Sequence, residues 1–132
     1  MKRELGLLLG ICVLSLSACG NEPDTGAVGS PTAAAPPNAA QIAFASNAVP
    51  SDPALAAVYE RSCKTCHSAI NTNAPLTGHT QAWRTRIAAK GEAALLVSVQ
   101  NGLNAMPAKG LSPDCTDEQF KALTVFMSTG GK

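Results

Sequence analysis

The stretch that most constrains this chain is Cys63-Lys64-Thr65-Cys66-His67. Two thiols separated by two residues, with a histidine directly after the second, form the pattern by which c-type haem is attached covalently. The two sulfurs can both reach the vinyl groups on one edge of a porphyrin, and the adjacent histidine then lies under the iron as its proximal ligand. The motif therefore predicts one covalent haem c, held by Cys63, Cys66 and His67.

Two other chemistries use closely spaced cysteines. A structural zinc site needs a second pair of ligands, and only His79 and Cys115 remain downstream, far apart in the sequence. A thioredoxin-like dithiol belongs in a βαβ context, which the flanking sequence does not offer. Both alternatives stay open from the motif alone, and the export signal at the N-terminus favours haem.

The N-terminus predicts export and lipid anchoring. Met1-Lys2-Arg3 gives a short basic start, and residues 5–18 are almost continuously apolar. This run suits a signal peptide and is too short for a bilayer span of roughly 20 residues. It ends at Cys19 and resembles a bacterial lipoprotein signal, with cleavage before that cysteine and lipid on its thiol. The alternative is an ordinary secretory peptide in which Cys19 is incidental.

The predicted signal peptide is residues 1–18, and residues 19–50 follow it as a tether. The tether is rich in Pro, Ala and Gly and carries only two charged residues, Glu22 and Asp24. It shows no apolar period that could build a core, so we expect a flexible spacer with a reach of about 30 Å. Cys19 is followed by Gly20 and Asn21, and the resemblance to known lipoproteins favours the outer over the inner membrane.

Residues 51–132 are predicted to form one small domain. A segment of this length is near the size at which an apolar core alone is marginal, and a covalent haem would reinforce it. The sequence predicts an all-α fold of short helices joined by loops. We expect helices from Ser51-Asp52-Pro53 into the haem motif, over residues 81–89 and 92–99, and from a capping box at Thr116 to Gly130, with loops at residues 71–78 and 106–113.

A histidine-bound iron has an opposite face that a second ligand can fill, and three residues are candidates. Met106 stands in an expected loop ahead of Pro107, which cannot continue a helix, and a rigid loop suits a residue that points a thioether at a metal. Met127 falls on the apolar face of the last helix, which favours a place in the core. His79 follows the proximal histidine closely, which favours a surface loop. We expect Met106 to be the distal ligand.

Four stretches together resemble the class I monohaem cytochromes c, and in particular the cytochrome c5 type. They are residues 63–67, Pro75, the run Asn101-Gly102-Leu103-Asn104-Ala105-Met106-Pro107-Ala108-Lys109-Gly110, and Asp114-Cys115-Thr116-Asp117-Glu118. The resemblance covers about residues 52–127. It implies a small all-α fold around one haem, Met106 as the distal ligand, and a hydrogen bond from the proximal histidine to the carbonyl of Pro75.

The chain departs from this family at two places: at Leu55 in the first helix, where the family often has Gly, and in the distal loop. The family's distal loop commonly has two cysteines three residues apart that form a disulfide, and here Ser112 stands at the first of these places and Cys115 at the second. The resemblance therefore implies that this cross-link is absent. We expect Cys115 to be buried as a small apolar residue, and the alternative is a thiol open to another chain.

The predicted function is electron transfer and not enzymatic catalysis. Two filled axial positions favour one-electron transfer over binding a small molecule, so we expect no small-molecule substrate. The expected partners are redox proteins as donors and acceptors, and the membrane through Cys19, on its periplasmic side. The formal net charge of +1 gives too weak a field for nucleic acid as a partner. The alternative is the haem domain of an enzyme, or of a gas- or peroxide-responsive protein, with a labile distal ligand.

Overall fold

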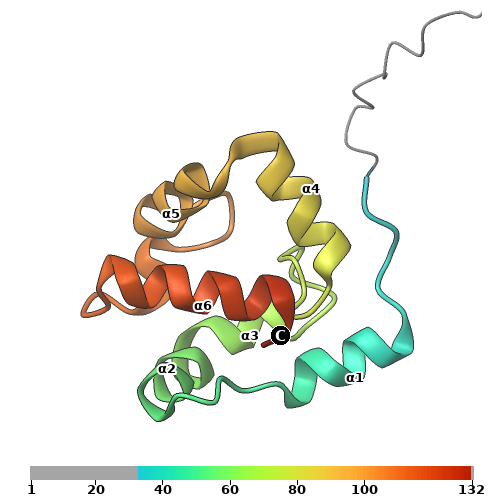
Figure 1. Ribbon diagram of the computed structural model, residues 1–132, viewed down its shortest axis with the longest axis horizontal. Helices are drawn as coiled ribbons and strands as arrows, with labels where there is room; N and C mark the ends of the chain where they lie inside the picture. Colours follow the sequence, from blue (N-terminus) through green and yellow to red (C-terminus); the bar gives the residue numbers. More distant parts are fainter. Residues whose placement is uncertain (1–32, 132) are drawn as a thin grey trace, which may run out of the picture.

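The computed structural model describes residues 33–131 of the chain. Those residues form helices joined by loops and contain no strand, as the predicted all-α class requires (Figure 1). In chain order the helical elements are α1 (Ala39–Asn47), α2 (Pro53–Val58), η1 (Tyr59–Cys63), α3 (Lys64–His67), α4 (Thr80–Lys90), α5 (Glu92–Asn101), η2 (Ala108–Leu111) and α6 (Asp117–Thr129). The predicted signal peptide and Cys19 lie outside the described residues. Among residues 33–131, no helix has the length and apolar character that crossing a membrane requires.

The segment that carries the haem motif is one continuous helical run. It begins as predicted at Asp52, whose carboxylate accepts a hydrogen bond from Leu55 N at 2.8 Å, with a proline in the first turn. α2 then widens into the π-helical turn η1, and α3 follows directly. Single π turns inside helices are frequent at functional sites. Here the turn ends at Cys63, the first residue of the haem motif.

The three later helices agree with the predicted ones to within one or two residues. α4 ends at Gly91 and α5 at Gly102, both with positive φ. α6 starts at the predicted capping box, in which the side chains of Thr116 and Gln119 each accept a hydrogen bond from the other residue's backbone N–H. It ends at Gly130 in the left-handed conformation that suits glycine.

The core forms around α6, which packs against α2 on one side and against α4 and α5 on the other (Figure 1). The rings of Tyr59 and Phe126 meet edge to face there, with centroids 5.1 Å apart. The buried core residues are Val58, Tyr59, Trp83, Cys115, Phe120, Leu123 and Met127. Because η1 belongs to this core, the helix that bears the haem cysteines is fixed to the C-terminal helix.

The prediction of an unstructured tether up to residue 50 is wrong for residues 39–47, which form α1. Alanine-rich sequence favours a helix, and Asn38 with Gln41 makes a complete capping box. The helix is held by Phe44, whose ring lies over two glycines: a Cβ on Gly78 would be 2.5 Å from its Cε1, and one on Gly130 would be 3.1 Å from its Cζ. This helix contains few large apolar residues, so its sequence shows no apolar periodicity that would predict it.

Phe44→Ala tests whether α1 belongs to the folded unit. The ring is 42% exposed, so its removal should lower the free energy of unfolding by about 1–2 kcal/mol, less than for a fully buried phenylalanine. Thermal or urea denaturation of the haem-loaded protein measures the change. The matched control is Ser46→Ala on the exposed side of the same helix. Equal stability of Phe44→Ala and the control would contradict the docking of α1.

Candidate haem site

The two motif cysteines lie on successive turns of the same helical run. Cys63 ends η1 and is partly buried, and Cys66 in α3 is exposed. Burial, with a smaller contribution from the nearby Cys115, raises the pKa of the Cys63 thiol to about 11. A redox-active dithiol needs a lowered thiol pKa, so this environment opposes the thioredoxin-like interpretation. All three cysteines among the described residues are free of disulfides.

His67 is held in the orientation and protonation state of a metal ligand. The ring is 5% exposed, and its Nδ1 donates a hydrogen bond to the carbonyl oxygen of Pro75 at 2.8 Å. Burial lowers the pKa of His67, so the neutral ring is favoured. Since a carbonyl only accepts, the proton lies on Nδ1, and Nε2 keeps its lone pair for a metal. This contact is the one that the sequence resemblance implied for Pro75.

The loop after the motif wraps around the histidine. Thr77 N donates to His67 O at 2.8 Å, and Thr72 Oγ1 donates to Cys66 O at 2.7 Å. The indole of Trp83 stacks on the imidazole of His67 with centroids 5.6 Å apart, and its Nε1 donates to Leu76 O at 2.9 Å. Sequence reasoning missed this contact, because only the fold brings α4 over the motif.

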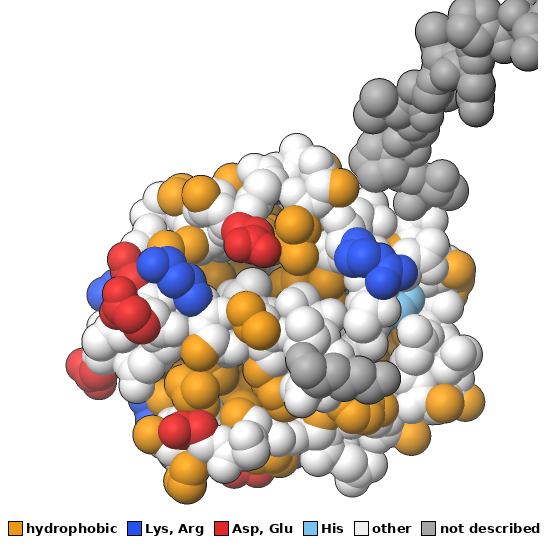
Figure 2. All heavy atoms as spheres, in the orientation of Figure 1, with side chains coloured by type: hydrophobic (Ala, Val, Ile, Leu, Met, Phe, Trp, Pro, Cys, Tyr) orange, Lys and Arg blue, Asp and Glu red, His pale blue; other side chains and the backbone are white. Residues whose placement is uncertain are grey.

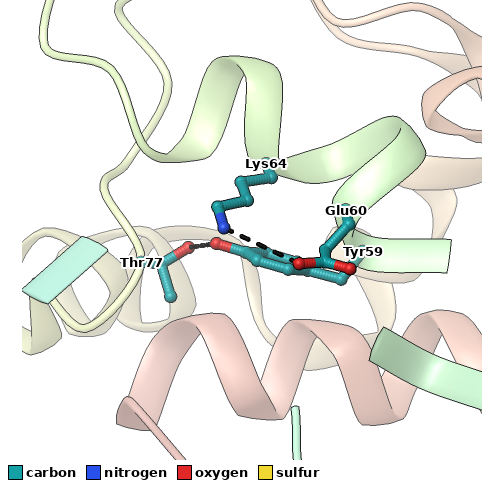
Figure 3. A network of polar contacts seen from close by, with 4 residues as sticks. All are labelled: Tyr59, Glu60, Lys64 and Thr77. Atoms are coloured by element: carbon teal, nitrogen blue, oxygen red, sulfur yellow. Dashed lines mark hydrogen bonds and ion pairs between the residues drawn. The ribbon is translucent and has the colours of Figure 1, made fainter. Parts of the chain in front are cut away.

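A buried pair of hydroxyl groups holds the loop that follows the haem motif. Tyr59 and Thr77 are both completely buried, and their hydroxyl oxygens lie 2.9 Å apart (Figure 3). Burial raises the pKa of the Tyr59 phenol, which therefore stays protonated. The pair links η1 to the loop that follows α3, so it fixes the two segments on either side of the haem motif. Sequence reasoning missed this pair because the two residues are far apart in the chain.

Met106 lies on a different segment, between α5 and η2, in what we call the distal loop (residues 102–115). Met106 and Leu103 exchange two backbone hydrogen bonds of 2.9 and 3.0 Å, which close a tight turn. Gly102 permits this turn, because a Cβ there would be 2.8 Å from Met106 O. The structure thus gathers Cys63, Cys66, His67 and Pro75 in one place and puts Met106 on a separate, tightly folded loop, half-buried.

The other candidate ligands have different surroundings. Met127 is 4% exposed in the core, which confirms its predicted place. Cys115 is 8% exposed, which confirms that it is buried. The expectation that His79 is a surface residue is wrong, because it is 5% exposed. Its backbone N–H donates a hydrogen bond to Leu76 O in the turn directly before α4. It lines the same cleft as Pro75, on the proximal side.

The donor set suits a covalently bound haem c. Two thiols with the required spacing stand beside a neutral, oriented imidazole whose Nε2 is free. Within residues 33–131 no three His, Cys, Asp or Glu side chains gather into a group that could hold a metal ion. Cys63 and Cys66 are therefore placed to hold the porphyrin edge, and His67 to ligate its iron.

Residues 50–127 match the family model described as cytochrome c oxidase, cbb3-type, subunit III. The chain is also 44% identical to a cytochrome c5 of Azotobacter vinelandii over 72 residues, which are 54% of this chain and 87% of that protein. A second cytochrome c5, from Ectopseudomonas mendocina, is 35% identical over 72 residues, 54% of this chain and 83% of that protein. This chain belongs to the cytochrome c family, as a class I monohaem member of the cytochrome c5 type.

The solved structures agree with this cytochrome assignment. A chain in the crystal structure of an electron-transfer complex of nitrite reductase with cytochrome c aligns with a TM-score of 0.51 and 33% sequence identity, covering 61% of this chain and 98% of that one. The cytochrome described here therefore binds haem c covalently and serves in electron transfer. The family match begins at residue 50, so α1 lies outside the part that the family model covers.

Thr77→Val tests the buried hydroxyl pair of this cytochrome. The change keeps the size of the side chain but leaves the Tyr59 phenol buried without a partner, which should lower the free energy of unfolding by roughly 1–3 kcal/mol. Denaturation of the haem-loaded protein measures this loss. Thr77→Ser keeps the hydroxyl and should retain most of the stability. A loss as large in Thr77→Ser as in Thr77→Val would mean that packing, and not the hydrogen bond, matters here.

Proposed function

We propose that this cytochrome is a one-electron carrier on the periplasmic side of a bacterial membrane, with His67 and Met106 as the axial ligands of its iron. Cys63 and Cys66 hold the haem through thioether bonds in this proposal. The observation that carries it is the buried, neutral His67, oriented by the Pro75 carbonyl so that Nε2 is available to iron. A ligand fixed in this way changes little between the two oxidation states, which suits fast electron transfer.

The haem supplies the one-electron ferric/ferrous couple, and the chain tunes it. The hydrogen bond to Pro75 raises the basicity of the His67 ring and fixes its orientation. The packing of Trp83 on the same ring keeps water from that side. A methionine as the second ligand raises the reduction potential and fills the remaining axial position.

Three features of the distal loop support Met106 as that second ligand. It is half-buried, its backbone is fixed by the paired hydrogen bonds with Leu103, and Pro107 follows it. Its competitors are placed less well. Met127 is enclosed in the core, and His79 shares a cleft with Pro75 on the side of the proximal ligand. Met106 is neither enclosed in the core nor on the proximal side, so it is the best-placed candidate for the second ligand.

The partners that fit this surface are redox proteins that bind transiently. One face shows charged side chains of both signs scattered among exposed apolar ones, with no large patch of a single sign (Figure 2). Within the haem motif, the positive charge of Lys64 is partly offset by Glu60 at 3.9 Å (Figure 3). A mixed surface of this kind favours small, transient docking. A solved relative was crystallised in complex with nitrite reductase, so partners of this cytochrome are sought among oxidoreductases.

The proposed location rests on the N-terminal sequence. A basic start, an apolar run of signal-peptide length and a cysteine at its end predict export followed by lipidation of Cys19. A covalent haem c on a chain with an export signal supports electron transfer outside the cytoplasm as part of this proposal. Retention at a membrane surface would confine the carrier near membrane-bound partners, and the residues after Cys19 favour the outer membrane.

Met106→Leu tests the axial ligand. Leucine keeps the apolar volume but cannot bind iron, so the ferric protein should lose the weak far-red absorption band of methionine ligation. The reduction potential should fall by on the order of 100 mV or more, a fraction of the roughly 0.8 V range that axial ligands span. Visible spectroscopy and redox titration of the haem-loaded protein measure both effects.

Met127→Leu is the matched control, because it makes the same substitution in the core. It should keep the far-red band and the potential. If Met106→Leu kept both and Met127→Leu lost them, the ligand assignment would be wrong. If the unmodified ferric protein lacked the band and bound carbon monoxide or cyanide rapidly, the haem domain of a gas- or peroxide-responsive protein or an enzyme would replace the carrier.

Cys19→Ser tests the lipid anchor. Without the thiol no lipid can be attached, so the haem-loaded cytochrome should move from the membrane fraction to the soluble fraction of the cell. Fractionation and labelling with a radioactive fatty acid measure the two properties. Cys115→Ser serves as the control, since that thiol is buried in the folded domain. Continued membrane association and labelling of Cys19→Ser would reject the anchor.

A further inference from the structure

The distal loop has an unusual backbone. Three of its non-glycine residues have positive φ: Asn104 at 54°, Lys109 at 55° and Leu111 at 66°. Left-handed backbone is unfavourable for residues with a side chain, least so for asparagine. A loop with several such residues keeps its shape only when contacts to the rest of the protein compensate for the strain. Met106 lies in the middle of this strained segment.

Hydrogen bonds from this loop to the rest of the cytochrome are scarce. The backbone hydrogen bonds of residues 103–115 outside helices all run within the loop itself. The ammonium of Lys109 also bonds internally, to Pro113 O at 3.1 Å. Among the hydrogen bonds of residues 33–131, a single one joins residues 103–115 to another part of the chain. It lies between Ser62 Oγ and Ser112 Oγ, 2.5 Å apart.

This hydrogen bond connects the two halves of the haem site. Ser62 belongs to η1 and directly precedes Cys63, the first cysteine of the haem motif. Ser112 directly follows η2, at the end of the strained turns that carry Met106. Ser112 is 1% exposed, so its hydroxyl has no access to water, whereas Ser62 is only half-buried. The bond therefore joins the distal loop, which carries Met106, to the helical run that carries the haem cysteines.

We propose that Ser62 and Ser112 form a latch that holds the distal loop closed and so positions the sulfur of Met106 on the iron. The proposal rests on the proposed function, because it requires Met106 to be the distal ligand. Both serines act as positioning residues through their hydroxyl groups. Opening of the latch lets the loop swing away and exposes the iron to an external ligand.

Cyanide binding to the ferric, haem-loaded full-length protein measures this opening, since cyanide can bind only when methionine has left. Ser112→Ala should speed cyanide binding about fivefold, because the half-exposed Ser62 left behind can bond to water. Ser62→Ala should speed it about tenfold or more, because the buried hydroxyl of Ser112 loses its only partner. The double variant should be no faster than Ser62→Ala, since both changes remove the same bond.

Three further variants separate a latch from a general loss of stability. Ser62→Thr keeps the hydroxyl and should bind cyanide at close to the wild-type rate. Ser128→Ala removes a serine hydroxyl that bonds only within α6, and it should change nothing. Phe44→Ala weakens the docking of α1 at a site away from the distal loop, so it should lower stability and leave the cyanide rate unchanged.

The results distinguish this proposal from the proposed function. A wild-type protein without the far-red methionine band overturns both, because there is then no methionine for the latch to position. A wild-type protein with the band, whose Ser62→Ala and Ser112→Ala variants bind cyanide at the wild-type rate, overturns the latch alone. If Ser112→Ala did not yield haem-loaded protein, Ser62→Ala at the less buried position would decide the matter by itself.

Discussion

The hydrogen bond from His67 Nδ1 to the Pro75 carbonyl is the constraint on which the haem site depends. It orients a buried ring, fixes the proton on one nitrogen and leaves the other nitrogen for iron. The acceptor lies eight residues away, so the intervening loop must be held in place. Thr77 supplies that support by bonding to the backbone of His67 and to the buried phenol of Tyr59.

The two sides of the proposed haem site are built by different physical means. The proximal side is made of buried, mutually bonded groups on elements that belong to the core, with Trp83 packed on the imidazole. The distal side is a loop of left-handed turns that bonds mostly to itself. In the proposed arrangement the rigid proximal side fixes the iron. The distal loop, which has few hydrogen bonds to other segments, sets how tightly the sixth position is closed.

The helix α1 extends the folded unit beyond the part of the chain that the family model matches. Its contact surface needs no side chain at two positions, because the ring of Phe44 occupies the space over Gly78 and Gly130. Gly130 also ends α6 in a left-handed conformation, so one glycine serves both the helix end and the docking of α1. The segment that leads toward the N-terminus is thereby attached beside the end of α6.

Much of this protein could be read from its sequence because its chemistry is local. The spacing of Cys63, Cys66 and His67, and the capping residues Asp52 and Thr116, act within one or two turns of a helix, so they predict the haem motif and the helix starts without any tertiary information. The resemblance to a known family added Pro75 as the partner of the histidine, which the structure confirms.

Only the tertiary structure decided the contacts between residues distant in the chain. The partners Tyr59 and Thr77 are 18 residues apart and Ser62 and Ser112 are 50 apart, and a hydroxyl carries no signal in the sequence of which distant group it will meet. The burial of His79 and the docking of α1 were misjudged for the same reason. Local spacing determines which groups can bind the haem, whereas burial and cross-chain hydrogen bonds depend on how the helices pack.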